Sequence, residues 1–395
     1  MTFKILFLFF CNFLKASVQL ELNNFFKIIN KSDVPIQFVS SGAFTKARKK
    51  LNYTIFTEMN DVSIEHFYEN NKYNTWNGFR LIACDGSIIN LPFHKKLAIE
   101  FGVKENQHTK YIQARISEAY DVLNQISIDA HLDKYSVSEQ KILVNHHLKK
   151  LQSDQLWLYD RNYPSTWLIA YHVSKNSNFC MRIQSNTWIK QQRKLKESPN
   201  NELITEITVR NDKRNKHEEL NLPITPIKVR FIKVELDSGE IEVLVTSLLD
   251  TKKYPAEIFK KLYALRWGVE ENYKIQKHKI EIENFTGLST LAIKQDFYAK
   301  IFMMNLGFIL SFNTKEEIDN KTKSRKHKYQ INQIKLMGSL KNCGFLIFIR
   351  KNYKSIIIKI LDVVAQNIEA IRPGRKFKRK RVFPKRFPIG YKPIS

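Results

Sequence analysis

Acidic residues are scarce in this chain of 395 residues, which has 38 Asp and Glu against 65 Lys and Arg and a formal net charge of +27. Such an excess of positive charge destabilises a compact chain by self-repulsion, so it indicates a polyanionic partner. Nucleic acid is the leading candidate, and an anionic membrane surface is the second. A drift of composition toward lysine is a third explanation, because the chain is also rich in Asn and Ile.

Cysteine and glycine are also scarce, with 4 and 12 residues. The four cysteines lie far apart and form no C-x-x-C pair, which argues against a zinc site or a disulfide framework and fits a reducing cytoplasm. The sequence contains no G-x-x-x-x-G-K-[ST] and no G-x-G-x-x-G, so no nucleotide cofactor is indicated. The adjacent His146 and His147 lack the spacing of metal ligands on a helix, and we expect them at the surface.

Long apolar runs are missing as well, and the N-terminal one is too short for a confident membrane span. The opening stretch MTFKILFLFFCNFLKAS combines a lysine, an apolar run and Ala16-Ser17, a pattern that resembles a signal peptide. Its cleavage pattern is poor, and the alternative is a buried first helix that continues into VQLELNNFFKIIN. The residues alone leave both interpretations open.

What is present suffices for a folded core, because 43% of the residues are hydrophobic. Between about 200 and 250, apolar and polar residues alternate with the period of β-strands. A helix predicted at 41–50 carries four basic residues, namely Lys46, Arg48, Lys49 and Lys50. These residues would either contact DNA phosphates or form a solvated helix end. The other expected elements are strands at about 112–121, 123–131 and 179–184, and helices at about 18–29, 62–70, 136–151, 164–175 and 288–312.

Two acidic residues follow short apolar runs that predict buried strands. The run that begins at Leu81 ends just before Asp85, and the strand expected at 155–159 ends just before Asp160. A third acid, Glu270, lies on a predicted helix. Carboxylates that converge raise one another's pKa unless cations are present, and hard cations such as Mg²⁺ prefer carboxylate oxygens. The pattern therefore predicts a shared site for two metal ions that acts on a phosphodiester, with chance placement as the alternative.

The third acid belongs to a helix that we expect to run without a break from Pro255 to about 280. At about 100° per residue, Tyr263, Arg266, Glu270 and Lys277 fall within an arc of about 60° and extend over about 21 Å. A separate apolar stripe faces the core, formed by Ile258, Leu262, Leu265, Val269 and Ile280. A solvated face with an Arg266–Glu270 ion pair is the alternative interpretation.

Three blocks of residues carry a resemblance to a known family. Tyr263, Arg266, Glu270 and Lys277 have the spacing Tyr-x2-Arg-x3-Glu-x6-Lys, which resembles the signature of bacterial insertion-sequence DDE transposases. More narrowly, it resembles the group named after insertion sequence four. ACDGSIINLP resembles the first-Asp block of that family and LYDRNYPS its second-Asp block, although Asn162 stands where glycine is common. The blocks occur in the order of the family, and the resemblance covers nearly the whole chain.

The resemblance implies an α/β fold with a ribonuclease H-like mixed-sheet catalytic core and a β-rich insertion, flanked by N- and C-terminal helical regions. The expected boundaries are 1–75 for an N-terminal helical DNA-binding region, 76–184 for the first part of the core, 185–252 for the β-strand insertion, 253–315 for the second part of the core with the catalytic helix, and 316–395 for a C-terminal helical region and basic tail. In that tail, residues 375–386 hold Lys or Arg at eight of twelve positions, a run that could bind nucleic acid or serve only as a solubilising terminus.

The resemblance also implies an activity, namely Mg²⁺- or Mn²⁺-dependent strand cleavage and strand transfer at the terminal inverted repeats of the element, by cut-and-paste with a DNA hairpin intermediate. Three residues carry over as catalytic ligands of two metal ions: Asp85, Asp160 and Glu270. Four residues carry over as DNA contacts: Tyr263, Arg266, Lys277 and Arg161. No aromatic residue of the insertion is assigned to stack on a flipped base, although Trp188 lies there.

The expected partners are double-stranded DNA, as element ends and as target, and a second copy of the chain in the synaptic complex. A bacterial cytoplasmic, nucleoid-associated location without a membrane follows from the same resemblance, which also favours a first helix of a DNA-binding domain over a signal peptide. Three alternatives remain. One is a truncated, catalytically inactive copy that only binds DNA, since family members usually have residues before this N-terminus. The others are a ribonuclease H-like nuclease and a basic secreted or membrane-surface protein.

Overall fold

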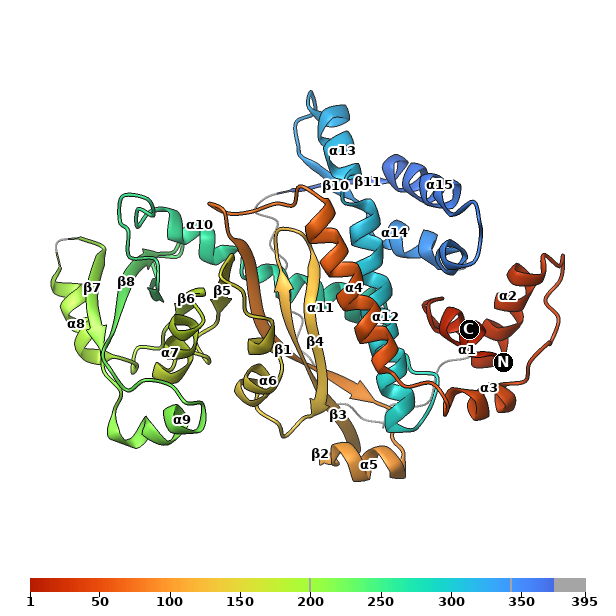
Figure 1. The fold of residues 1–395 in the computed structure, drawn as a ribbon, viewed down its shortest axis with the longest axis horizontal. Helices are drawn as coiled ribbons and strands as arrows, with labels where there is room; N and C mark the ends of the chain where they lie inside the picture. Colours follow the sequence, from red (N-terminus) through yellow and green to blue (C-terminus); the bar gives the residue numbers. More distant parts are fainter. Residues whose placement is uncertain (199, 342, 373–395) are drawn as a thin grey trace.

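The computed structural model describes residues 1–198, 200–341 and 343–372, so the basic run at 375–386 lies outside the described part (Figure 1). A mixed sheet forms the centre of the molecule. Its strands are β1 (Arg80–Leu91), β2 (Lys104–Glu105), β3 (Lys110–Asp121), β4 (Ile126–Lys134), β5 (Gln155–Tyr159), β6 (Asn178–Arg182), β7 (Glu202–Ile207), β8 (Ile227–Glu235) and β9 (Ile241–Thr246). They lie in the order β2–β3–β1–β5–β6–β9–β8–β7, and β4 pairs with β3.

Helices surround this sheet. Those before and within the strand region are α1 (Phe3–Phe10), α2 (Val18–Asn30), α3 (Ser41–Arg48), α4 (Thr54–Asn70), α5 (Lys95–Phe101), α6 (Glu139–Asn145), α7 (Thr166–Ser174), α8 (Ile189–Glu197) and α9 (Arg214–Glu219). Those after it are α10 (Ile258–Ala264), α11 (Trp267–His278), α12 (Thr290–Ser311), α13 (Thr314–Thr322), α14 (Gln333–Leu340) and α15 (Tyr353–Gln366). Short 3₁₀ turns occur at His147–Lys150, Asn211–Lys213 and Gly344–Phe348, and a separate ribbon pairs β10 (Tyr329–Ile331) with β11 (Ile368–Ala370).

The centre of the sheet is parallel and its flanks are antiparallel. β5 lies parallel to both β1 and β6, whereas β3 runs antiparallel to β1, and β9 antiparallel to β6. Successive side chains of β1 enter different apolar clusters: Leu81 and Ala83 face one, Ile82 and Cys84 the other. A strand buried on both faces shows a continuous apolar run, which is why Leu81–Cys84 could be recognised in the sequence.

The strands of the predicted insertion extend this same sheet. β9 pairs with β6, with Cys180 opposite Thr246, and β8 and β7 follow outward. In Figure 1, β7, β8, α8 and α9 form one end of the molecule. The alternating pattern at about 200–250 therefore predicted strands correctly, and their sheet is continuous with the central strands.

α12 is the central helix, and α4 lies beside it against β4 (Figure 1). Asn305 in the middle of α12 is fully buried and links the three elements: its Oδ1 accepts from the Ser127 N–H at 2.9 Å, and its Nδ2 donates to Asn60 Oδ1 at 2.8 Å. Within the described ranges, none of the helices combines the length and apolarity that crossing a membrane requires.

The N-terminal segment is the buried first helix expected as one of two alternatives. Leu6, Leu8, Phe9 and Phe10 of α1 are buried. The Phe9 ring lies 5.3 Å from the Phe25 ring of α2 and 5.0 Å from that of Phe44, which holds α1, α2 and α3 together. Burial of several aromatic rings in the core accounts for the apolar character of this opening stretch.

Three expectations about elements are wrong. The strand that contains Asp85 continues to Leu91, and the strands expected at 112–121 and 123–131 are separated by a turn at 122–125.

The predicted continuous helix at 255–280 is two helices, α10 and α11, joined at Leu265 and Arg266. Both joining residues are right-handed helical, but their N–H groups bond three residues back, to Leu262 and Tyr263, which interrupts the regular ladder. Leu265, expected in the core, is 37% exposed.

Two basic or titratable side chains expected at the surface are buried. Arg48 of α3 donates to Gln295 Oε1 at 2.8 Å and Thr286 Oγ1 at 2.9 Å and pairs with Asp296, so it is not available to DNA. His147 is fully buried, with Nδ1 2.6 Å from Asp129 Oδ2. Both positions are determined by contacts between distant segments, which local sequence patterns do not reveal.

Candidate active site

The two aspartates predicted to meet lie side by side at the centre of the sheet. The parallel pairing of β1 with β5 ends where Cys84 lies opposite Tyr159. Asp85 directly follows Cys84, and Asp160 directly follows Tyr159. Asp160 then enters a turn, in which its Oδ1 accepts from the Asn162 N–H at 2.8 Å. Asp85 remains in β1, opposite Glu118 of β3. Parallel pairing thus brings together two acids that are far apart in the sequence.

Burial dominates the electrostatics of Asp85. Burial is the main reason that the pKa of the Asp85 carboxyl rises from an ordinary value of 3.8 to about 7. The Gly86 N–H and Arg266 act to lower this pKa, and the Asp160 and Glu139 carboxylates act to raise it. A carboxyl in this environment binds either a proton or a cation.

Arg266 connects the third acid to the first. Its Nη1 lies 3.8 Å from Asp85 Oδ2, and its Nη2 donates to Glu270 Oε1 at 2.8 Å. The guanidinium is mostly buried and lies against the ring of Trp267, which is 49% exposed. The structure therefore brings Asp85, Asp160 and Glu270 into one neighbourhood, with Arg266 as the cation between two of them.

The other predicted DNA contacts differ in their accessibility. Tyr263 is buried, and its hydroxyl donates to the Tyr159 carbonyl at 3.2 Å, directly before Asp160. Lys277 is partly buried, and its ammonium donates to Ser87 Oγ at 2.7 Å, two residues after Asp85. Burial lowers the pKa of Lys277. Arg161 is exposed, and its carbonyl accepts from Gln184 Nε2 at 3.0 Å.

Buried polar groups hold the main chain at Asp85. The Tyr273 hydroxyl of α11 donates to the Asp85 carbonyl at 2.7 Å, and the Ser117 hydroxyl of β3 donates to it at 3.3 Å. Ser117 Oγ is in turn 2.9 Å from Nε2 of His147. These contacts tie β1 to α11 and β3, so the position of Asp85 is determined by three elements.

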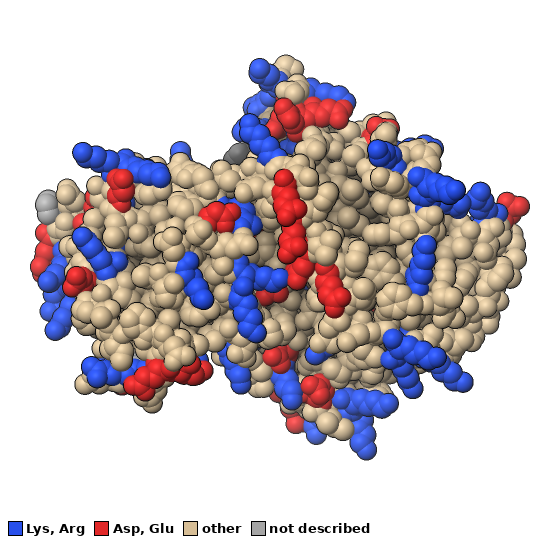
Figure 2. Space-filling view, in the orientation of Figure 1, with Lys and Arg blue, Asp and Glu red and all other residues tan. Residues whose placement is uncertain are grey.

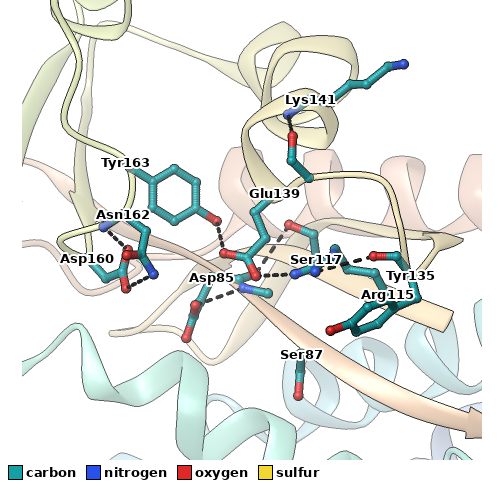
Figure 3. A network of polar contacts seen from close by, with 12 residues as sticks. Asp85, Ser87, Arg115, Ser117, Tyr135, Glu139, Lys141, Asp160, Asn162 and Tyr163 are labelled. Carbon is teal, nitrogen blue, oxygen red and sulfur yellow. Dashed lines mark hydrogen bonds and ion pairs between the residues drawn. The ribbon is translucent and has the colours of Figure 1, made fainter. Parts of the chain in front are cut away.

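Glu139 is a fourth acid at the site, which the sequence interpretation did not identify (Figure 3). It begins α6, and its carboxylate accepts from Arg115 and, at 3.4 Å, from the Tyr163 hydroxyl. Burial, together with the Asp160 charge, raises its pKa. The sequence gives no specific signal for this role, because an acid in the first turn of a helix is common for electrostatic reasons.

No functional role is assigned to Trp188 of the predicted insertion. Trp188 precedes α8 with a positive φ of 48°, and its ring lies 6.0 Å from that of Phe231 in an edge-on contact. It is half-buried and packs against the sheet.

The donor set fits a divalent cation by its chemistry. Carboxylate oxygens are the ligands that Mg²⁺ and Mn²⁺ prefer, and the raised pKa of Asp85 shows that its negative charge is poorly compensated. As the side chains lie, no three acidic, histidine or cysteine residues in the described part of the chain form a ready-made metal site. Arg266 supplies the positive charge between Asp85 and Glu270.

Fold and site together define an α/β protein in which acids from two parallel strands and a helix meet beside a mixed sheet. Residues 76–306, more than half of the chain, match the family model described as the transposase DDE domain. The chain belongs to this family, so the expected DDE transposase family is confirmed.

The other comparisons are more distant. No curated protein matches the chain. The solved structures that match include the cryo-EM structure of the piggyBac transposase synaptic complex with hairpin DNA. Its sequence identity is 10% and its TM-score 0.42, over 95% of this chain and 78% of that one.

Proposed function

We propose that this protein is a DNA transposase that cuts DNA strands at the ends of its own mobile element and joins them to target DNA. The observation that carries the proposal is the neighbourhood of Asp85, Asp160 and Glu270, which β1, β5 and α11 supply within a transposase DDE domain. The strand order β4–β3–β1–β5–β6, with its parallel β1–β5 and β5–β6 pairs, supports a ribonuclease H-like core. The spacing of Tyr263, Arg266, Glu270 and Lys277 supports membership of the insertion sequence four group.

In this proposal, Asp85, Asp160 and Glu270 hold Mg²⁺ or Mn²⁺, as two ions. Bound divalent cations supply Lewis-acid stabilisation of the scissile phosphate and lower the pKa of an attacking water. The chain itself contributes the fixed placement of the carboxylates, through the β1–β5 register and the hydrogen bonds to the Asp85 carbonyl.

The basic residues around the acids would hold the DNA backbone. Arg266 directly precedes α11 and Lys277 lies near the end of that helix, so the two flank Glu270, and Arg161 follows Asp160. Arginine suits bidentate phosphate contacts and lysine a point contact. A phosphate contact by Tyr263 requires its hydroxyl to leave the Tyr159 carbonyl. We include a second copy of the chain on paired DNA ends, and a hairpin intermediate, in the proposed reaction.

The net charge of the chain supports a DNA partner. Figure 2 shows Lys and Arg side chains spread over much of one face, with Asp and Glu side chains between them and a short row of acids near the middle. The acids exposed on α4 are Glu58, Glu65 and Glu69. With a net charge of +27, association with a polyanion relieves the self-repulsion of the chain.

The test uses the purified chain of 395 residues and a linear duplex that carries the DNA flanking its gene. With Mg²⁺ present, we expect strand cleavage at the inverted repeats, followed by joining of the released ends to a supercoiled target plasmid. Cleavage without joining would replace the proposal with a ribonuclease H-like nuclease. Equal binding with and without Mg²⁺, and no cleavage, would replace it with an inactive DNA-binding copy.

A further inference from the structure

Glu139 occupies a junction between the strands and turns that carry the first two acids. It is the first residue of α6, whose start is fixed by Ser138, since the Ser138 hydroxyl accepts from the Lys141 N–H at 3.2 Å. A fixed helix start gives the Glu139 side chain a defined origin. Figure 3 shows its carboxylate beside Asp85 and pointing toward the turn that contains Asp160 and Tyr163.

The Glu139 carboxylate contacts two elements through separate oxygens. Oε1 pairs with the Arg115 guanidinium of β3, and Oε2 accepts from the Tyr163 hydroxyl at 3.4 Å. Tyr163 is fully buried, and its N–H donates to the Asp160 carbonyl at 3.3 Å. Glu139 thus contacts the turn that follows Asp160 through Tyr163, and it contacts β3 through Arg115.

The same carboxylate closes over the residue after Asp85. A Cβ added to Gly86 would lie 2.6 Å from Cγ, Cδ and Oε1 of Glu139, which is closer than non-bonded atoms approach. The Gly86 N–H also donates to Asp85 Oδ1 at 2.8 Å, so its backbone orients the Asp85 side chain. An alanine at position 86 would therefore require the Glu139 side chain to shift.

We propose that Glu139 is a positioning residue that fixes Asp85 relative to Asp160 by bridging Gly86, Arg115 and Tyr163. The inference deepens the proposed function and rests on it, because a fixed carboxylate pair matters only if the pair binds cations. Groups that orient metal-binding side chains typically change metal affinity or activity by about 10- to 100-fold when removed.

The first experiment tests the contact itself and needs neither metal nor activity. It compares the thermal unfolding midpoints of the wild type, Gly86→Ala, Glu139→Ala and the double variant, all in EDTA. We expect Gly86→Ala to lower the unfolding midpoint in the wild type, and to lower it by less than half as much in the Glu139→Ala background, which lacks the clashing carboxylate. An equal loss in both backgrounds would overturn the bridge over Gly86.

The second experiment tests positioning by Mn²⁺ titration calorimetry, with cleavage of the flanking-DNA duplex as a parallel readout. Glu139→Ala should weaken Mn²⁺ binding by about 10-fold or more, and Glu139→Gln, which keeps an oxygen for Tyr163, by less. Glu105→Ala is the matched control, because that side chain is 67% exposed and pairs only loosely with Lys110 at 3.9 Å.

The outcomes separate the two claims. If the wild type binds Mn²⁺ and cleaves DNA, and Glu139→Ala does both equally well, the positioning role is wrong and the proposed function stands. If the wild type itself neither binds Mn²⁺ nor cleaves, the proposed function fails, and the positioning role fails with it. A Glu139→Ala protein with weakened Mn²⁺ binding and an unfolding midpoint near that of the Glu105→Ala control would support positioning over a general loss of stability.

Discussion

Asp85 lies in surroundings that disfavour its charged form. Its carboxyl is largely buried beside two other acids, Asp160 and Glu139, and the Arg266 guanidinium lies 3.8 Å from it. A carboxyl in such surroundings favours its neutral form. In the proposed function, a bound divalent cation would remove that preference.

The pKa of Asp85 predicts a pH-dependent effect of Asp85→Asn. Because the folded chain binds this proton more tightly than the unfolded chain, the contribution of Asp85 to the free energy of unfolding is fully present below about pH 4 and is lost as the pH rises to about 7. The raised pKa, from 3.8 to about 7, sets an upper limit of about 4 kcal/mol for the loss. The midpoint of Asp85→Asn should therefore rise relative to the wild type between pH 4 and pH 8.

The measurement is thermal unfolding in EDTA across that pH range. Glu118, whose buried carboxyl also has a pKa raised to about 7, contributes equally to both proteins and cancels in their difference. Asp237→Asn is the control, because that side chain is 93% exposed. A constant difference between Asp85→Asn and the wild type from pH 4 to pH 8 would contradict the environment assigned to Asp85.

Arg48 shows, at the scale of elements, how the N-terminal helices are fixed to the body of the molecule. Arg48 is the last residue of α3, and its side chain is buried against α12. There it pairs with Asp296 at 3.3 Å and donates to Gln295 at 2.8 Å. Gln295 Nε2 returns a bond to the Arg48 carbonyl at 2.9 Å. The α3 helix is thereby joined to the helix that supports β4.

Arg48→Met should destabilise the protein strongly. Removing one partner of a buried ion pair leaves the other charge uncompensated, which typically costs about 3–5 kcal/mol. Urea unfolding followed by circular dichroism measures the change. Lys46→Met, an exposed change on the same helix, should lie within about 0.5 kcal/mol of the wild type. A loss below about 1 kcal/mol for Arg48→Met would show that α3 does not depend on this pair.

The same scale shows what the sequence could predict. The buried strands before Asp85 and Asp160 could be recognised because strands covered on both faces are continuous apolar runs. The break between α10 and α11 could not, because Leu265 and Arg266 keep helical dihedral angles and only their hydrogen bonds shift. Glu139 could not be found either. Its role depends on contacts with Gly86 and Arg115, and no local pattern shows that these residues meet.

Charge and topology determine the behaviour of the whole molecule. The chain has a net charge of +27, to which the run at 375–386, outside the described residues, contributes eight Lys and Arg; the rest is spread over the sheet and the helices around it. Such a surface binds DNA largely through phosphates, with release of condensed counterions. DNA affinity and catalysis should therefore respond to different changes.

Binding to a non-specific duplex should weaken steeply with salt and should not need the acids. Each neutralised phosphate contributes a slope of about −0.9 to the dependence of log K on log salt, so we expect a slope steeper than about −4. Fluorescence anisotropy with a labelled duplex at several KCl concentrations measures it. Asp160→Asn in EDTA should give the same slope as the wild type. A shallow slope, or loss of binding in Asp160→Asn, would contradict this separation.

The most direct test of the account is cleavage of the flanking-DNA duplex by Asp85→Asn, Asp160→Asn and Glu270→Gln in Mg²⁺. Glu271→Gln is the matched control, because Glu271 neighbours Glu270 on α11 but is exposed and pairs with Lys274. We predict that each of the three variants binds the duplex but cleaves it more slowly than the wild type by a factor on the order of 100 or greater. The control should cleave as the wild type does. Wild-type cleavage by any one of the three would contradict a site shared by these acids.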